Sequence, residues 1–264
     1  MTSMLRGMLL KDSLVGTRRL ALWLLLTLYL VLWTGGVVQH FLIGQTPSGP
    51  NWIASLFLML AALIVLITTA SGSDFLRLVC IALAGLMVEA LGVRAGLPFG
   101  AYSYTDVLQP QLFGVPLVMA CAWMVLVAYL EQMARYLSLN AWAKVVLAAL
   151  WMTAIDLVID PLAAKTLGYW RWVDVGTYYG IPASNFAGWF IVSLLIFSLV
   201  RREWRENYWA SAMGLSILLF FTLIALAHQL FLAGGIGLML SLAHLLMRYR
   251  ILPSTKGTSK TLLC

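Results

Sequence analysis

Residues 208–247 read YWASAMGLSILLFFTLIALAHQLFLAGGIGLMLSLAHLLM, a run without a single Lys, Arg, Asp or Glu. A soluble domain interrupts its apolar runs with charges, whereas about 18 or more uncharged, mostly apolar residues are enough for a helix that crosses a bilayer. Similar runs recur along the chain, which is 62% hydrophobic and only 10% charged. Soluble domains have about 25% charged residues. The sequence therefore predicts an all-α polytopic membrane protein, with residues 1–264 forming a single integral membrane domain.

The apolar pattern predicts eight membrane-spanning helices. They cover about 20–42, 52–70, 76–93, 112–130, 142–160, 186–200, 208–226 and 230–247. The first run, 20–43, is longer than the hydrophobic part of a signal peptide and lacks a clear cleavage site, so we expect it to be retained. Gly234 and Gly235, between the last two runs, either belong to a turn or allow close helix packing.

The distribution of basic residues tests this number of spans, because loops on the cytoplasmic side are enriched in Lys and Arg. With the N-terminus inside, the outer segments hold only Arg94, Lys165 and Arg171 of the 17 basic residues. We therefore expect both termini on the inner side of the cell (cytoplasmic) membrane, with a basic cytoplasmic N-terminus at 1–19 and a flexible cytoplasmic tail at 249–264. The other 14 basic residues fall inside: Arg6, Lys11, Arg18, Arg19, Arg77, Arg135, Lys144, Arg201, Arg202, Arg205, Arg248, Arg250, Lys256 and Lys260.

Several classes of protein are disfavoured by the composition. The net charge of +7 comes from residues between apolar runs and not from a basic stripe, so we expect no nucleic-acid partner. Cys80, Cys121 and Cys264 form no CxxC pair, which argues against disulfides and thiolate metal sites. Three histidines are too few for the His-rich clusters of a membrane di-iron oxygenase. A GxGxxG motif for a flavin or nicotinamide cofactor is also missing.

Two long connections, 94–111 and 161–183, are rich in Gly, Pro and aromatic residues and resemble each other. Gly100-x-Tyr-x-Tyr-x-Asp106 matches Gly168-x-Trp-x-Trp-x-Asp174 at an offset of 68 residues, and both are followed by Gly-x-Pro and then Trp at an offset of 66. We infer two copies of a helix–loop–helix unit, at 84–126 and 151–192, related by an approximate twofold axis along the membrane normal. Chance similarity between two aromatic-rich loops is the alternative.

Three carboxylates fall within predicted spans, where an acidic side chain costs roughly 2.5–3.5 kcal/mol on insertion scales. Asp156 and Asp160 are one helical turn apart and point the same way. Glu89 lies near the end of the third span. The alternatives to a functional role are an interfacial position for Asp160, which precedes a proline, and an ion pair between Glu89 and Arg94.

Further polar and aromatic residues are expected at the same outer level of the membrane. An aromatic belt at the interface explains most of the rings without any function, and each polar residue alone suits an ordinary role such as helix capping by Asn185. Where two rings are one residue apart in an extended segment, however, both face the same way. Rings beside carboxylates can stabilise a carbocation. The polar residues are Gln39, His40, Asn185, His228 and Gln229, and the rings are Tyr102, Tyr104, Trp123, Trp170, Trp172, Tyr178, Tyr179 and Trp189.

Four motifs in this order resemble the membrane carotenoid biosynthesis family that includes the CruF-type carotenoid 1,2-hydratases. They are Glu89-Ala-Leu-Gly92, Gly96-Leu-Pro-Phe-Gly100-Ala-Tyr-Ser-Tyr-Thr-Asp106, Asp156-Leu-Val-Ile-Asp-Pro161 and Tyr178-Tyr-Gly-Ile-Pro-Ala-Ser-Asn-Phe-Ala-Gly-Trp189. The resemblance covers roughly residues 80–200, and the outer helices match only in hydrophobicity.

The resemblance implies addition of water across the terminal C=C bond of an acyclic (psi-end) carotenoid, giving a tertiary alcohol without metal or cofactor. Our hypothesis makes Asp156 the acid, kept protonated by apolar burial, and Glu89 or Asp160 the base that orients water, with the reverse assignment equally open. The carotenoid would enter from the lipid, and other carotenoid-pathway enzymes are further expected partners. The expected substrate-binding residues are Tyr102, Tyr104, Asp106, Trp123, Trp170, Trp172, Asp174, Tyr179, Asn185 and Trp189.

Two other classes of protein suit the same residues. Asp156-x-x-x-Asp160 could chelate magnesium for a prenyl diphosphate, which would suit a membrane prenyltransferase, and a carotenoid cyclase would also use acid chemistry. A small proton-coupled transporter would use the intramembrane carboxylates as a relay. The transporter predicts polar residues that continue through the helices to the inner face, and the sequence has few there.

Overall fold

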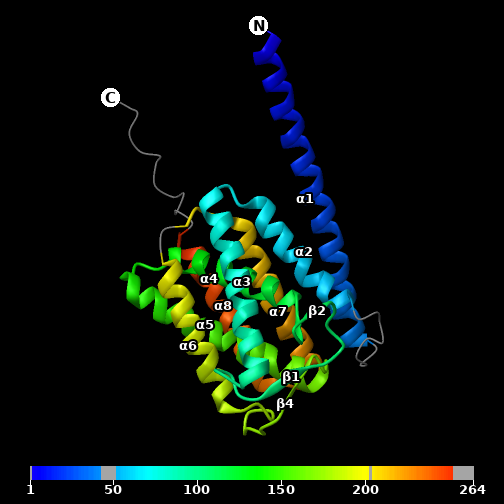
Figure 1. The fold of residues 1–264 in the computed structure, drawn as a ribbon, viewed down its shortest axis with the longest axis vertical. Helices are drawn as coiled ribbons and strands as arrows, with labels where there is room; N and C mark the ends of the chain where they lie inside the picture. The colour runs from blue at the N-terminus through cyan, green and yellow to red at the C-terminus, as the bar shows by residue number, and fades with distance from the viewer. Residues whose placement is uncertain (1, 43–51, 202–203, 252–264) are drawn as a thin grey trace, which may run out of the picture.

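The computed structural model describes residues 2–42, 52–201 and 204–251. In this part of the chain, eight α-helices run alternately up and down as a bundle (Figure 1). The helices are α1 (Thr2–Leu42), α2 (Trp52–Thr68), α3 (Gly72–Ala95), α4 (Val118–Arg135), α5 (Ala141–Pro161), α6 (Ala183–Val200), α7 (Tyr208–Ala227) and α8 (Phe231–Ile251). A π-helical turn, η1 (Leu162–Thr166), follows α5, and four short strands complete the fold: β1 (Tyr102–Tyr104), β2 (Gln111–Leu112), β3 (Val115–Pro116) and β4 (Trp170–Trp172).

Seven of the described helices are long and apolar enough to cross a membrane, and α2 is apolar but slightly shorter. The prediction of an all-α polytopic membrane protein is therefore confirmed. Helix α1 begins at Thr2 and not near residue 20, so the segment predicted as a basic N-terminus is helical up to the apolar stretch Gly16–Leu42. The predicted tail at 249–264 lies outside the described residues from 252 onward.

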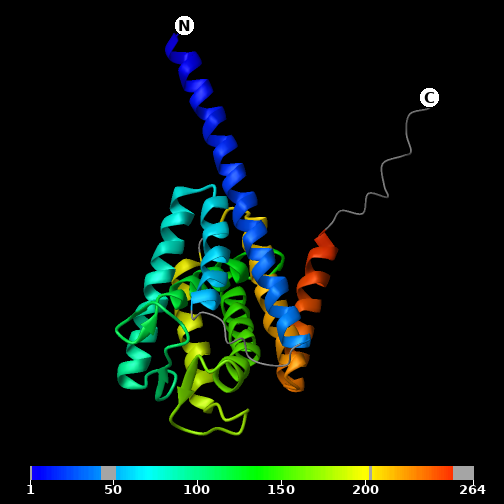
Figure 2. The same cartoon turned by 90° about the vertical axis from the view of Figure 1, so that its right-hand side faces the viewer.

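The bundle has two distinct ends. The strand end holds β1 to β4, and the terminal end is where α1 begins and α8 ends (Figures 1 and 2). The chain therefore enters its first helix and leaves its last helix at the same end of the bundle, as an even number of crossings requires. That this end faces the cytoplasm stays a prediction from the basic residues.

Helix α4 is the central helix of the fold. It packs against α2, α3 and α7, and 67% of the residues in its apolar stretch are buried, compared with 6% for α1. The contact with α3 depends on a glycine, because a Cβ at Gly85 would lie 2.4 Å from Cγ of Trp123. A helix–helix contact this close is possible only where a side chain is missing. Gly85 therefore fixes where the Trp123 ring lies beneath the strands.

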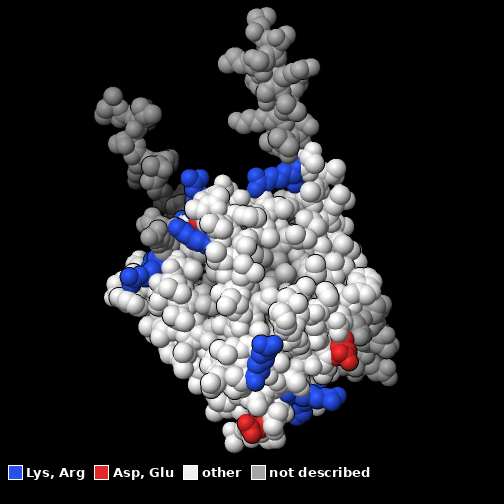
Figure 3. All heavy atoms as spheres, viewed as in Figure 1, with Lys and Arg blue, Asp and Glu red and all other residues white. Residues whose placement is uncertain are grey.

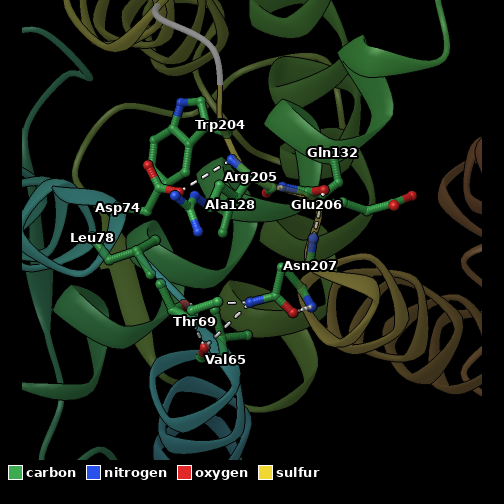
Figure 4. A pocket seen from close by; sticks show the side chains of 12 residues that line it. Val65, Thr69, Asp74, Leu78, Ala128, Gln132, Trp204, Arg205, Glu206 and Asn207 are labelled. Atoms are coloured by element: carbon green, nitrogen blue, oxygen red, sulfur yellow. Dashed lines mark hydrogen bonds between the residues drawn. The ribbon is translucent and has the colours of Figure 1, made fainter. Parts of the chain in front are cut away.

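A polar network ties the helices together at the terminal end (Figure 4). Asn207 accepts hydrogen bonds from the first amides of α7, and its own amide donates to Val65 O and Thr69 Oγ1 of the α2 end. Its backbone N–H donates to Gln132 of α4 at 3.0 Å. On α3, Asp74 pairs with Arg77 and accepts from the backbone N–H of Arg205 at 3.1 Å. The connection before α7 is thereby fixed to three helices.

The long connections form matching turns at the strand end. Phe113 and Gly114, between β2 and β3, have φ of 53° and 78°, and Tyr179 and Gly180 have φ of 53° and 88°. Two successive positive φ values are the signature of a type I′ turn, and the two turns are 66 residues apart. Helix α4, predicted from residue 112, begins at Val118 because 111–116 forms this hairpin.

Gly234 and Gly235 both lie inside α8, and the turn between the last two helices comes before them. A Cβ at Gly234 would lie 2.4 Å from Cδ2 of Leu226 on α7, whereas Gly235 has open space. Of the two alternatives left by the sequence, Gly234 is therefore a packing glycine.

Candidate active site

The three intramembrane carboxylates meet at the strand end of the bundle. Glu89 lies near the end of α3, and Asp156 and Asp160 lie one turn apart near the end of α5. All three are buried, with exposed fractions of 3%, 5% and 1%. Asp160 is therefore covered on all sides by the protein itself.

Glu89 accepts three hydrogen bonds. The hydroxyls of Tyr102 and Tyr104 donate to Oε2 at 2.5 and 2.8 Å, and Nε1 of Trp123 donates to Oε1 at 3.0 Å. Burial, with the charge of Glu89 second, raises the pKa of both phenols, which therefore stay protonated as donors. The alternative pairing of Glu89 with Arg94 does not occur, because the guanidinium of Arg94 lies over the Phe113 ring at 5.7 Å.

Asp160 also accepts three hydrogen bonds. The indoles of Trp170 and Trp172 donate to Oδ1 at 2.6 and 3.2 Å, and Nδ2 of Asn185 donates to Oδ2 at 2.7 Å. The same Nδ2 donates to Oδ2 of Asp156, also at 2.7 Å. The amide of Asn185 therefore bridges the two aspartates, and its side chain does not cap α6, whose N-cap is Pro182.

The two long connections reach the carboxylates because each contains one extended strand. Strands β1 and β4 pair antiparallel, with Tyr102 opposite Trp172 and Tyr104 opposite Trp170. Alternate side chains of a strand share a face, so each strand directs two rings towards one carboxylate. The opposed rings also contact each other, with centroids 5.0 and 5.8 Å apart. The strand pair thus forms an aromatic lid over the carboxylates.

The carboxylates and rings surround a cavity of about 20 Å³, enough by size for one water molecule. A space lined by both acidic groups and aromatic rings can hold a water, and such rings can stabilise a cationic centre beside it. The lining residues are Glu89, Phe99, Tyr102, Tyr104, Met119, Asp156, Asp160, Trp170, Trp172, Asn185 and Trp189.

Four of the expected site residues do not line this cavity. Trp123 is hydrogen-bonded to Glu89, and its ring stacks on that of Trp189 with the centroids 4.4 Å apart and an interplanar angle of 11°. Asp106 and Asp174 are exposed on their loops. Tyr179 accepts a hydrogen bond from the backbone N–H of Leu232 at 3.2 Å, so it ties its turn to the start of α8.

Two lining residues were not expected from the sequence, Phe99 and Met119. The ring of Phe99 lies 5.8 Å from that of Trp189 and 6.3 Å from that of Tyr102. Its position inside the Gly96-Leu-Pro-Phe-Gly100 motif was the available signal. Met119 lies in the first turn of an apolar helix, where nothing in the sequence separates it from its neighbours.

Of the polar residues expected at one level, Asn185, His40 and His228 take two different places. Asn185 joins the carboxylates, whereas Nδ1 of His40 and Nε2 of His228 hydrogen-bond to each other at 2.9 Å between α1 and α7. Neither histidine lines the cavity of the carboxylates. The histidine pair therefore connects two helices and is separate from the candidate site.

Comparison with known proteins identifies the family of this chain. Over 130 residues it is 35% identical to a bisanhydrobacterioruberin hydratase of Haloarcula japonica, a match that spans 46% of this chain and 44% of that protein's length. No solved structure matches the chain. The family described as carotenoid biosynthesis protein matches residues 50–249, which include all three carboxylates and both aromatic strands. The chain belongs to this carotenoid biosynthesis family.

Proposed function

We propose that the protein is a hydratase that adds water across the terminal C=C bond of an acyclic, psi-end carotenoid and leaves a tertiary hydroxyl. The observation that carries the proposal is a cavity of about 20 Å³, the size of one water molecule, between three buried carboxylates and a lid of aromatic rings. The relative from Haloarcula japonica, which bears the name of a hydratase, supports the same reaction class.

Asp156 is the acid in this mechanism. Within the described residues, Asp156 accepts one hydrogen bond, from Asn185, whereas Glu89 and Asp160 accept three each. Hydrogen bonds donated to a carboxylate stabilise its charged form, so the group with the fewest donors is the one that carries a proton. Asp156 transfers this proton to the terminal alkene carbon that bears hydrogen, and the positive charge forms on the tertiary carbon.

The faces of the lid rings stabilise this tertiary cation while water approaches it. Glu89 or Asp160, each an anion with one acceptor position left beside its three donors, takes a proton from the attacking water. The hydroxyl bonds to the tertiary carbon, and the proton held by the base returns to Asp156 for the next turnover. The sum of these steps is alkene plus water giving alcohol, so the chain's own residues suffice and no redox step is needed.

The substrate reaches the site from the lipid. A polyene of this kind is comparable in length to the roughly 30 Å hydrocarbon core, so its body can lie along the helices while one end reaches the strand end. Because the cavity of about 20 Å³ fits only one water, rings that line it, such as Phe99 and Trp189, must shift to admit the terminal carbons. The orientation, with the strand end on the outer side of the cell membrane, belongs to the proposal, as does association with other enzymes of the pathway.

Expression in a host that makes lycopene or another acyclic carotenoid tests the proposal. We expect a pigment one water heavier than the substrate, with its oxygen taken from labelled water. Asp156→Asn and Glu89→Gln together should abolish it. Glu206→Gln, a carboxylate-to-amide change at the exposed terminal end, is the matched control and should leave the yield unchanged. Comparing Glu89→Gln with Asp160→Asn identifies the base, because its loss should cost the larger factor.

Five outcomes would overturn the proposal. Oxygen that does not come from water, or full activity in the Asp156→Asn and Glu89→Gln double variant, would refute the mechanism. A product isomeric with its substrate would indicate a cyclase, and a strict requirement for magnesium with a prenyl diphosphate would indicate a prenyltransferase. Proton-coupled uptake by vesicles without any pigment change would indicate a transporter.

A further inference from the structure

A groove of about 460 Å³ opens between α4, α5 and α6 at the terminal end, away from the candidate active site. Lys144, near the start of α5, lines it, whereas Asp156 lies 12 residues further along the same helix. At 1.5 Å per residue this places the two about 18 Å apart along the helix axis. The groove lining is Glu131, Ala134, Arg135, Leu139, Ala141, Lys144, Val145, Ala148, Phe197, Arg201 and Trp204.

Three basic side chains line the groove, one from α4, one from α5 and one from the residue that follows α6. Arg135 donates a hydrogen bond to the backbone oxygen of Trp204, which fixes its guanidinium at the rim. The guanidinium of Arg201 lies over the Trp142 ring at 4.7 Å. Lys144 is half-buried in the wall beside Glu131, the single acid of the lining. The groove therefore has an excess of positive charge held on side chains with defined positions.

The other wall of the groove is apolar and buried. Val145, Ala148 and Phe197 have exposed fractions of 4%, 7% and 1%, and they lie on the α5 and α6 turns that lead into the membrane. Trp142 beside the groove is exposed, as is usual for a tryptophan at a membrane interface. Charged side chains gather towards the two ends of the bundle, and the band between them is largely free of charge on the face seen in Figure 3. The groove thus lies where lipid headgroups and acyl chains meet.

We infer that this groove binds the phosphate headgroup of an anionic phospholipid, with the start of an acyl chain against Leu139 and Trp142, whose apolar side chains are exposed at the rim of the groove. Basic pockets between membrane helices suit such headgroups because the surface charges attract anionic lipid and the apolar wall accepts the chain. A volume of about 460 Å³ is within the range of small-molecule sites. A soluble phosphate would leave the exposed side chains of Leu139 and Trp142 at the rim of the groove uncovered, which favours the lipid as the source of the anion.

The test measures lipid retained by the full chain, purified from nanodiscs that contain equal amounts of phosphatidylglycerol and phosphatidylcholine. We expect the wild type to be enriched in phosphatidylglycerol and to melt several degrees higher in that lipid than in phosphatidylcholine alone. Lys144→Gln with Arg201→Gln should lose most of this enrichment and of the melting shift. The charge-conserving pair Lys144→Arg with Arg201→Lys should retain both.

Arg248→Gln, which removes a positive charge from α8 at the same end of the bundle but outside the groove, is the matched control. Equal loss of enrichment in this control would overturn the proposal, because a diffuse surface charge would then explain the binding. Unchanged enrichment in the Lys144→Gln and Arg201→Gln double variant would overturn it as well. An equal melting shift from inorganic phosphate in detergent would refute the lipid as the ligand.

Discussion

Ser103 stands directly opposite Arg171 at the centre of the β1–β4 pair, and the two aromatic pairs flank them symmetrically. The strands come from the two connections whose sequences resemble each other, and each connection also carries a turn with two positive φ values. The proposed duplication of 84–126 and 151–192 is supported by both features. In sequence Glu89 corresponds to Asp156, but by hydrogen bonding its counterpart is Asp160, since each accepts from the two rings of its own strand.

Trp123→Phe should lower hydratase activity about tenfold or more while it largely keeps the ring stacking on Trp189. The substitution removes one donor to the Glu89 carboxylate, and a hydrogen bond to a charged group contributes about 1.5–3 kcal/mol. Pigment yield per mole of membrane protein is the measurement. Trp151→Phe is the control, because Trp151 lies outside the cavity lining and its buried indole N–H has no hydrogen-bond partner in the described part of the chain, and equal losses in the two variants would refute a special role for the Trp123 N–H.

Gly85→Ala should destabilise the protein and reduce activity, because the new methyl group would lie 2.4 Å from Cγ of Trp123 and push the ring away from Glu89. Gly235→Ala, in open space on α8, should instead be neutral or stabilising by about 0.5–1 kcal/mol, since glycine in a helix interior is less stable than alanine. Thermal melting of both variants in one detergent makes the comparison. Equal melting temperatures would contradict the close α3–α4 contact.

Asn185→Leu should cost about 1.5–3 kcal/mol of stability because both aspartates lose their shared donor in a buried site. The same substitution should cost much less in a background of Asp156→Asn with Asp160→Asn, where no carboxylate is left to stabilise. A double-mutant cycle on melting free energies measures the difference. If the cost is the same in both backgrounds, the amide bridge contributes nothing to stability.

The membrane orientation is testable with single cysteines in a background where Cys80, Cys121 and Cys264 are alanine. Thr177→Cys, exposed at the strand end, should react with an impermeant maleimide in intact cells. Ser138→Cys, exposed between α4 and α5 at the terminal end, should react only after the membrane is opened. The reverse pattern would place the site on the cytoplasmic side and contradict the positive-inside prediction.

The helices were predictable because a membrane span needs a long apolar run, and that requirement leaves a strong signal in the sequence. The start of α4 was placed too early because the hairpin at 111–116 is also apolar, and hydropathy does not distinguish a short hairpin from a helix turn. The first span agrees with the prediction, since the apolar part of α1 is Gly16–Leu42, whereas the helix itself extends back to Thr2 because charged residues end an apolar run without ending a helix.

The grouping of the site residues was predictable only in part. Asp156 and Asp160 share a helix face, and the shared direction of the two rings in each long connection follows from strand geometry. Both groupings could therefore be predicted from local structure alone. The bridge made by Asn185 and the pairing of β1 with β4 connect segments far apart in the chain. Asp106 and Asp174 belong to the repeated pattern but are exposed and do not line the cavity, because a repeated pattern can reflect loop geometry as well as chemistry.

Glu89 and its three donors all lie between residues 89 and 123, and Asp160 and its three donors lie between residues 160 and 185. A carboxylate that entered lipid without donors would cost several kcal/mol. During biogenesis, we therefore expect each helix pair to bring the partners of its own carboxylate into the membrane. Insertion of one pair then need not wait for the other, and only the strand pair and the cavity beneath it depend on both.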